Sequence, residues 1–210
     1  MSVKIKICGI TNPADGWAAH EAGADAIGLV FYAKSPRAVT AEQVAQWRHD
    51  LPPFVSVVGL FVNAAPQAVV RTLELCALDR IQLHGDEAPT HCRPYGARAI
   101  RAIRVAQASD LLGLDRWPVG ALLLDAKVKG AYGGTGESFD WQLLRETKLP
   151  RPLILAGGLN PDNVEAAVRS VQPHGVDVSS GVESAPGLKD LDKMHRFVAA
   201  VRRGQKDAGS

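Results

Sequence analysis

Lys4-Ile-Lys-Ile-Cys-Gly-Ile-Thr11 is the stretch of sequence that decides the fold class. It predicts a short strand whose isoleucines point to one face, because successive side chains of a strand alternate. The other face carries Lys4, Lys6 and Cys8. Central strands of an open parallel sheet are buried on both faces and are apolar throughout. A strand with one polar face therefore favours a closed barrel, whose inner face opens to substrate at one end.

Seven further apolar runs repeat this strand and alternate with segments of helical spacing. The predicted strands cover residues 4–8, 26–31, 56–61, 80–84, 99–103, 121–125, 153–156 and 176–179. The predicted helices lie near 44–51, 69–76, 164–171 and 191–201, with shorter ones after the fourth to sixth strands. Two later strands also gather polar residues on one face, namely Arg80, Gln82 and His84, and Asp177 and Ser179.

Eight strand and helix units in 210 residues predict an α/β protein with a single-domain (β/α)8 TIM barrel. The barrel is expected over residues 1–203, followed by a polar tail over 204–210. An open doubly wound sheet is the main alternative.

The composition is that of an ordinary globular domain, with 46% hydrophobic and 22% charged residues. The net charge is +2 and the basic residues are scattered, which argues against a nucleic-acid partner. The sequence contains no signal peptide pattern and no membrane-spanning apolar stretch, so we expect a cytoplasmic protein without a membrane partner. The cysteines Cys8, Cys76 and Cys92 are odd in number and widely spaced, and they indicate neither a disulfide framework nor a metal site.

Cys8 is a candidate catalytic residue because its sulfur shares a face with two lysines. Neighbouring positive charge lowers the pKa of a thiol from its ordinary value of about 8.5, which favours a base or nucleophile near neutral pH. The alternative is a small buried hydrophobic side chain, which is the usual role of a free cysteine.

Two glycine-rich turns follow the last two predicted strands. The first contains Gly157 and Gly158 and leads into Asn160 and Pro161, a pattern typical of a helix start. The second consists of residues 178–181. Backbone N–H groups in such turns bind phosphate, most often after strands seven and eight of a barrel. The alternative is that both are ordinary tight turns.

Four more side chains are candidates at the same end of the barrel. Asp125 ends the sixth strand after three leucines and is either a helix cap or a functional acid. Arg37 lies on a turn after the second strand and is either solvated or a receptor for a substrate carboxylate. His84 and Asp177 point inward, and each either contacts substrate or is a satisfied polar group of the interior. Residues 130–136 are rich in glycine and indicate a mobile loop over the barrel mouth, or a plain linker.

Several motifs in chain order together resemble the phosphoribosylanthranilate isomerase family of tryptophan biosynthesis, across nearly the whole sequence. They are Lys6-Ile-Cys8-Gly-Ile-Thr11, Ser35-Pro-Arg37, Gln82-Leu-His84-Gly85, Leu124-Asp125, Gly133-Gly-Thr-Gly136, Leu155-Ala-Gly-Gly-Leu-Asn160-Pro-Asp-Asn-Val164 and Asp177-Val-Ser-Ser-Gly-Val-Glu183. The resemblance implies an Amadori rearrangement of N-(5-phosphoribosyl)anthranilate to 1-(2-carboxyphenylamino)-1-deoxyribulose 5-phosphate, without metal or cofactor.

The resemblance also implies a role for each candidate. Asp125 is then the general acid that opens the sugar ring, and Cys8 is the general base that removes the proton from sugar carbon two. Arg37 holds the anthranilate carboxylate, and His84 and Asp177 contact substrate. The phosphate lies on Gly157, Gly158, Ser179, Ser180 and Gly181. The expected partner is a small phosphorylated substrate, and the chain is expected to be a monomer or a homodimer.

Two other functions fit a phosphate-binding barrel. Asp125-Ala-Lys127 is faintly similar to the Asp-x-Lys-x-x-Asp motif of ribulose-phosphate decarboxylases, but Gly130 stands where that motif needs its second aspartate. A non-catalytic sensor of a phosphorylated ligand is the second alternative, since a fold with an anion site does not imply catalysis.

Overall fold

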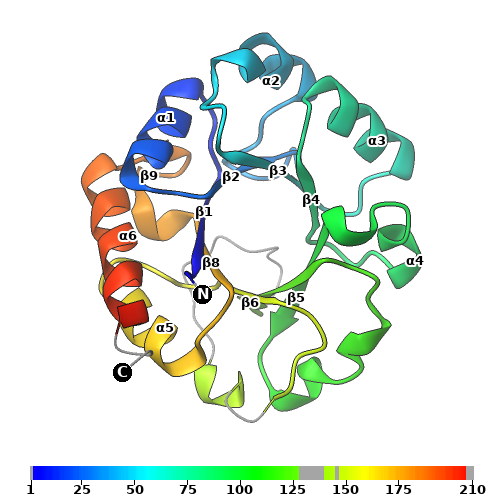
Figure 1. The fold of residues 1–210 in the computed structure, drawn as a ribbon. Coiled ribbons are helices and arrows are strands. Elements are labelled where there is room, and N and C mark those ends of the chain that lie inside the picture. The colour runs from blue at the N-terminus through cyan, green and yellow to red at the C-terminus, as the bar shows by residue number, and fades with distance from the viewer. Residues whose placement is uncertain (1, 128–139, 145–146, 207–210) are drawn as a thin grey trace.

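The computed structural model describes residues 2–127, 140–144 and 147–206 of the 210-residue chain. Eight parallel strands pair in chain order and close into a barrel, because β1 also pairs with β8 (Figure 1). The strands are β1 (Lys4–Cys8), β2 (Ala26–Val30), β3 (Ser56–Phe61), β4 (Arg80–Leu83), β5 (Ala99–Val105), β6 (Ala121–Ala126), β7 (Leu153–Leu155) and β8 (Gly175–Val178). The predicted (β/α)8 barrel is confirmed, and each strand end lies within two residues of its predicted position.

Helices surround the barrel (Figure 1). They are α1 (Pro13–Ala22), α2 (Ala41–Trp47), α3 (Pro66–Leu75), α4 (Pro89–Cys92), α5 (Val164–Val171) and α6 (Leu191–Lys206). Short 3-10 turns cover Arg48–Asp50, Gly96–Arg98, Ala108–Leu111, Leu114–Arg116, Trp141–Leu144 and Ser180–Val182. The described segments between β4 and β7 thus hold only short helical pieces, as the weak helical spacing of that region predicts.

Capping residues mark the starts of α1 and α2. Asn12 precedes α1, and its side chain accepts a hydrogen bond from the backbone N–H of Asp15. Thr40 and Gln43 form a capping box before α2. At the other end of the chain, α6 continues to Lys206, three residues past the boundary expected at 203. Gly204 allows this close packing, because a Cβ atom there would lie 2.8 Å from a carbonyl oxygen of α5.

The hydrophobic core has two main compartments, as strand alternation requires. The larger one lies between the strands and the helices and includes Ile5 and Ile7 of β1. The smaller one fills the lower part of the barrel interior and consists of Val58, Ile100, Ala102, Leu123 and Ala156. Polar side chains and a third small apolar cluster, which includes Cys8, lie above this layer, toward the C-terminal ends of the strands.

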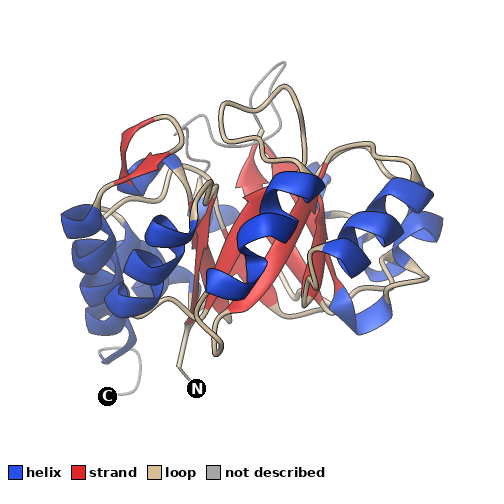
Figure 2. Ribbon diagram, turned by 90° about the horizontal axis from the view of Figure 1, so that it is seen from above, coloured by secondary structure: helices blue, strands red, loops and turns tan. Residues whose placement is uncertain are grey.

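A small antiparallel hairpin follows β8. It consists of β9 (Glu183–Ala185) and β10 (Leu188–Lys189). Figure 2 shows it at the end of the molecule opposite to both termini, which is the end where the barrel strands finish. The sequence does not predict this hairpin, because its strands are too short to show alternation.

A cavity of about 640 Å³ lies at the N-terminal ends of the strands. Its walls include Lys4, Ser56, Arg80 and Ala121, the first residues of four strands. Phe54, which lies between α2 and β3, borders this cavity and is 92% exposed. None of the helices in the described part of the chain has the length and apolar character that crossing a membrane requires.

Candidate active site

Cys8 and Lys6 face the interior of the barrel from β1. Ile5 and Ile7, at the alternate positions, belong to the core outside the barrel. Gly28 of β2 pairs with Cys8, and a Cβ atom at Gly28 would lie 2.6 Å from Cys8 Sγ and 2.9 Å from Lys6 Nζ. The absence of a side chain at Gly28 therefore leaves the space in which thiol and ammonium group meet.

Lys6 forms a buried ion pair with Asp177 of β8, with Nζ 2.9 Å from Oδ1. Burial opposes the charge on Lys6, but the Asp177 carboxylate and Cys8 outweigh it and raise the pKa of Lys6. Burial also raises the pKa of Asp177, although Lys6 acts in the opposite direction. The pair thus places a protonated lysine beside the thiol.

The expected lowering of the Cys8 pKa is wrong in direction. Burial raises the pKa of the thiol, and Lys6, which lowers it, offsets only part of this effect. Lys4 is exposed at the far end of the strand, where its Nζ lies 2.7 Å from Asp25 Oδ1. Of the two lysines on the strand, only Lys6 is placed to act on Cys8.

Asp125 faces the barrel interior from the end of β6. Its Oδ2 atom lies 3.2 Å from His84 Nε2, a close contact that lacks the alignment of a hydrogen bond. Gln82 Nε2 lies 2.9 Å from His84 Nδ1. If the amide nitrogen of Gln82 donates this bond, the ring proton of His84 is on Nε2 and faces the carboxylate. The Asp125 carboxylate is close enough to Asp177 to raise the pKa of Asp177, and His84 acts on that pKa in the opposite direction.

The two glycine-rich turns lie against each other and against Asp125. Gly157 has a φ of +82°, and a Cβ atom there would lie 3.1 Å from Asp125 Oδ1. A Cβ atom at Gly181 would lie 2.0 Å from the carbonyl oxygen of Leu159. Gly157 and Gly181 are thus required for close backbone packing, and the turns after β7 and β8 form one continuous surface beside the acid.

The turn after β7 has the expected cap in a different form. The Asn160 Oδ1 atom accepts hydrogen bonds from the backbone of Asp162 at 2.9 Å and of Asn163 at 3.2 Å. The regular helix α5 covers Val164–Val171, the range that its apolar spacing predicts, and begins one turn after Pro161, where the cap pattern would start it. Asn163 in turn donates to the carbonyl of Gly158 at 2.8 Å. These bonds fix the glycine turn in place.

Arg37 lies in a buried ion pair with Glu183 rather than in solvent. Arg37 Nε is 2.8 Å from Oε1, and Nη2 is 2.7 Å from Oε2. Hydrogen bonds with Glu183 raise the pKa of Arg37. The stem of Arg37 crosses Gly9, where φ is +81° and a Cβ atom would lie 2.5 Å from Arg37 Cδ. The glycine after Cys8 therefore permits this arginine to approach the thiol.

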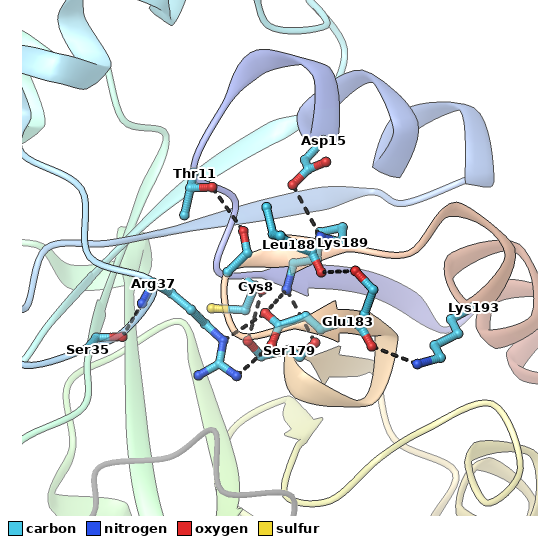
Figure 3. Close-up of polar contacts among 12 residues, drawn as sticks. Cys8, Thr11, Asp15, Ser35, Arg37, Ser179, Glu183, Leu188, Lys189 and Lys193 are labelled. Carbon is cyan, nitrogen blue, oxygen red and sulfur yellow. Dashed lines mark hydrogen bonds and ion pairs between the residues drawn. The ribbon is translucent and has the colours of Figure 1, made fainter.

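Figure 3 shows how Ser179 joins these groups. Its hydroxyl donates to the backbone oxygen of Cys8 at 3.0 Å. Its own carbonyl accepts from Lys189 Nζ at 3.3 Å, and the same Nζ donates to Glu183 Oε1 at 2.7 Å. The turn after β8, the Cys8 strand and the Arg37 ion pair are thus connected directly.

Three residues of this site, Gln82, Glu183 and Lys189, have no predicted role. Gln82 shares the inner face of its strand with the candidate His84, which is a usable signal. Glu183 ends one of the motifs quoted above, but neither its spacing nor the resemblance gives it a function. Lys189 follows a glycine turn in a hairpin that the sequence does not predict, so no signal pointed to it.

The other two cysteines lie away from this site, and the predicted loop over the barrel mouth is not described. Cys76 and Cys92 are free and buried in the core outside the barrel, and burial raises the pKa of Cys76 to about 11. Residues 130–136, the predicted loop over the mouth, lie outside the described residues. In the described ranges, no three His, Cys, Asp or Glu side chains are grouped as a metal site requires.

This arrangement supports general acid–base chemistry on an anionic ligand. A thiol on β1 and a carboxylate on β6 face one interior from strands three apart around the closed barrel. The glycine turns and Arg37 lie at the same mouth and offer N–H donors and positive charge.

Comparison with known proteins agrees with these features. Residues 5–200 match the sequence profile of the family described as N-(5'-phosphoribosyl)anthranilate (PRA) isomerase. A protein of that name from Magnetococcus marinus is 76% identical over 209 residues and covers 100% of both chains. The crystal structure of the phosphoribosylanthranilate isomerase from Thermotoga maritima is 40% identical, with a TM-score of 0.86 over 95% of this chain and 98% of that one. Another structure of a phosphoribosylanthranilate isomerase, 39% identical with a TM-score of 0.83 over 95% of this chain and 98% of that one, contains reduced 1-(o-carboxyphenylamino)-1-deoxyribulose 5-phosphate. The chain belongs to the N-(5'-phosphoribosyl)anthranilate isomerase family.

Proposed function

We propose that Asp125 and Cys8 are the general acid and general base with which this chain isomerises N-(5'-phosphoribosyl)anthranilate, a step of tryptophan biosynthesis. The observation that carries this proposal is the position of both groups on the inner face of one barrel mouth, on separate strands. Ring opening needs a proton donor on one side of the sugar, and carbon deprotonation needs an acceptor on another. A single group could not serve both places.

The reaction then proceeds in two proton transfers. Asp125 donates a proton to the furanose ring oxygen, the ring carbon–oxygen bond breaks, and a protonated Schiff base forms at carbon one. The Cys8 thiolate removes the proton from carbon two, and the electron pair moves toward the nitrogen to give an enolamine. In the last step the hydroxyl group on carbon two loses a proton and carbon one gains one, which converts the enolamine to the ketone without loss of a substrate atom.

Binding of both charged ends holds the sugar between these groups. Gly157, Gly158, Ser179, Ser180 and Gly181 bind the phosphate through the paired turns after β7 and β8. The proposal is supported by the close contact of Gly181 with the first turn, which makes the two turns a single surface. Arg37 binds the anthranilate carboxylate at the other end.

His84 and Asp177 belong to the same pocket in this proposal. His84 lies against Asp125 and contacts the substrate near the ring oxygen. Asp177 holds Lys6 and lies below the sugar. His84 also keeps Asp125 in a fixed position. Asp177 does the same for Lys6, which lies beside Cys8.

The test is a fluorescence assay of the purified chain with freshly made N-(5'-phosphoribosyl)anthranilate, with and without a chelator. We expect turnover that the chelator does not change. A lack of turnover would contradict the proposal and favour the sensor. Release of carbon dioxide or dependence on magnesium would favour the decarboxylase.

We also propose that two copies of the chain associate through the end of the barrel that carries Phe54, and that the protein is cytoplasmic. The Thermotoga maritima isomerase is described as dimeric in a structure 38% identical to this chain, with a TM-score of 0.82 over 95% of this chain and 98% of that one. A phenylalanine that is 92% exposed beside this cavity supports pairing of this chain with a second copy. The cytoplasmic location is supported by membership in a family of biosynthetic enzymes.

A further inference from the structure

Glu183 and Lys189 have no role in the catalytic proposal. They form a charged cluster with Arg37. Glu183 begins β9 and Lys189 ends β10, and the two residues are paired across the hairpin. Their side chains are 4% and 0% exposed, and that of Arg37 is 10% exposed. Figure 3 shows all three side chains gathered beside Cys8. Such burial of three charges is costly unless each has a partner.

The geometry of the cluster fixes the guanidinium group. Glu183 engages Nε and Nη2 of Arg37 along one side of the fork, at 2.8 Å and 2.7 Å. Nη1 takes no part in this pair. A guanidinium group has five N–H donors, so the end of the fork can still bind a second carboxylate.

The charges of the cluster do not cancel. Arg37 and Lys189 each contribute one positive charge and Glu183 one negative charge. Burial alone would raise the pKa of Glu183, but the hydrogen bonds from Arg37 and Lys189 prevail and lower it, so Glu183 is ionised. Burial lowers the pKa of Lys189, while Glu183, 2.7 Å away, favours its ammonium form. One positive charge is left over.

The hairpin that carries the cluster is tied to the rest of the site. Lys193 Nζ donates to the backbone oxygen of Glu183 at 2.7 Å, and Thr11 Oγ1 donates to the carbonyl of Gly187 at 3.1 Å. Lys189 Nζ also donates to Ser179, which holds the backbone of Cys8. A shift of the cluster would therefore move Arg37 relative to the thiol and the phosphate turn.

We propose that Glu183 and Lys189 are positioning residues for Arg37: Glu183 aims the guanidinium group, and Lys189 neutralises Glu183 so that one positive charge is free for the substrate carboxylate. This inference rests on the proposed function, in which Arg37 binds that carboxylate. Without Lys189, the charges of Arg37 and Glu183 would cancel, and the cluster would attract a carboxylate much less.

The test compares two probes in the full-length protein. The first probe is reduced 1-(o-carboxyphenylamino)-1-deoxyribulose 5-phosphate, and the second is the same compound without the carboxylate. In Lys189→Met we expect binding of the first probe to weaken by about tenfold or more, which corresponds to the loss of about one charge-assisted hydrogen bond. Binding of the second probe should change by less than about twofold. Lys189→Arg keeps the charge and should bind both probes nearly as the wild type does.

A double variant separates charge balance from structure. Lys189→Met together with Glu183→Gln has the same net charge in the cluster as the wild type and leaves no buried carboxylate without its partner. It should recover part of the affinity for the carboxylate probe that Lys189→Met loses. Equal weakening of both probes in Lys189→Met, or no recovery in the double variant, would overturn the inference.

The outcome for the proposed function is read separately. Turnover by the wild type together with unchanged probe selectivity in Lys189→Met overturns the inference alone. No turnover by the wild type overturns the proposed function.

Discussion

Gly28 of the neighbouring strand β2 pairs with Cys8, and the space of its missing side chain is filled by the thiol and by the ammonium group of Lys6. Gly28 does not have a positive φ, so its backbone would accept another residue. The reason for glycine is therefore the close approach of these two side chains. The catalytic proposal thus depends on a residue that takes no part in chemistry.

Gly28→Ala tests this dependence. The new methyl group would lie 2.6 Å from Cys8 Sγ and 2.9 Å from Lys6 Nζ, so both side chains must move. We expect kcat/KM to fall by at least about tenfold, because small displacements of a reacting group are costly. The measurement is steady-state kinetics, with circular dichroism and thermal unfolding as controls for the fold. Wild-type kinetics in a folded Gly28→Ala protein would show that the thiol position is unimportant.

Cys8→Ser and Asp125→Asn test the acid and the base themselves. Each removes one proton-transfer group and keeps the shape of the side chain, so we expect kcat to fall by at least about 10²-fold, the scale of general acid–base catalysis. Both variants should still bind reduced 1-(o-carboxyphenylamino)-1-deoxyribulose 5-phosphate, measured by calorimetry. Near-normal turnover in either variant would refute the role of that residue.

The sequence predicts the barrel well because the first strand combines a periodic pattern with polar residues on one face. Cys8 and Asp125 end such strands, so their inward positions follow from alternation alone. The sequence pattern does not reveal whether the environment of Cys8 lowers or raises the pKa of the thiol. Burial and the Lys6 ammonium act in opposite directions, and only the packing around Gly28 and Asp177 decides which prevails. Lys189 could not be found, because its role depends on a hairpin contact rather than on a local pattern.

The pH dependence of the wild-type enzyme reports on Cys8. Burial raises the pKa of the thiol, so the thiolate forms only above the ordinary value of about 8.5. After ring opening Asp125 has already given up its proton, so where the Cys8 step limits turnover we expect kcat to rise with pH through this range. Rates measured from about pH 6 to about pH 10 provide the test. A flat profile would mean that at least one titrating group is misassigned.

Lys6→Met shows whether the neighbouring lysine tunes this base. Lys6 lowers the pKa of Cys8, so its removal should move the rising limb to higher pH and reduce activity more at neutral than at alkaline pH. The charged groups Asp177, Lys189 and Arg37 also act on or beside the thiol and are unchanged. Because Lys6→Met leaves Asp177 buried without its partner, Lys6→Met with Asp177→Asn is the control for folding. An unshifted limb in both variants would exclude this role for Lys6.

Arg37→Ala tests recognition of the substrate carboxylate. Loss of a bidentate, charge-assisted contact should raise KM by at least about tenfold and lower kcat less. Arg37→Lys keeps the charge but not the fork, so its KM should lie between those of the wild type and of Arg37→Ala. A substrate made from aniline, which lacks the carboxylate, should not distinguish these variants. If KM is unchanged in Arg37→Ala, Arg37 only stabilises Glu183.

Phe54→Asp tests pairing of two copies through the end of the barrel opposite the active site. Phe54 is 92% exposed beside the cavity there, and a charge at its position would have to be desolvated in any contact between copies. We expect light scattering to show a dimer for the wild type and a monomer for Phe54→Asp, with turnover retained because the acid and base lie at the other end. Leu112→Asp is the matched control, since Leu112 is 72% exposed away from this cavity and its replacement should leave the dimer intact. A monomeric wild type, or dissociation by both variants alike, would contradict pairing through this end.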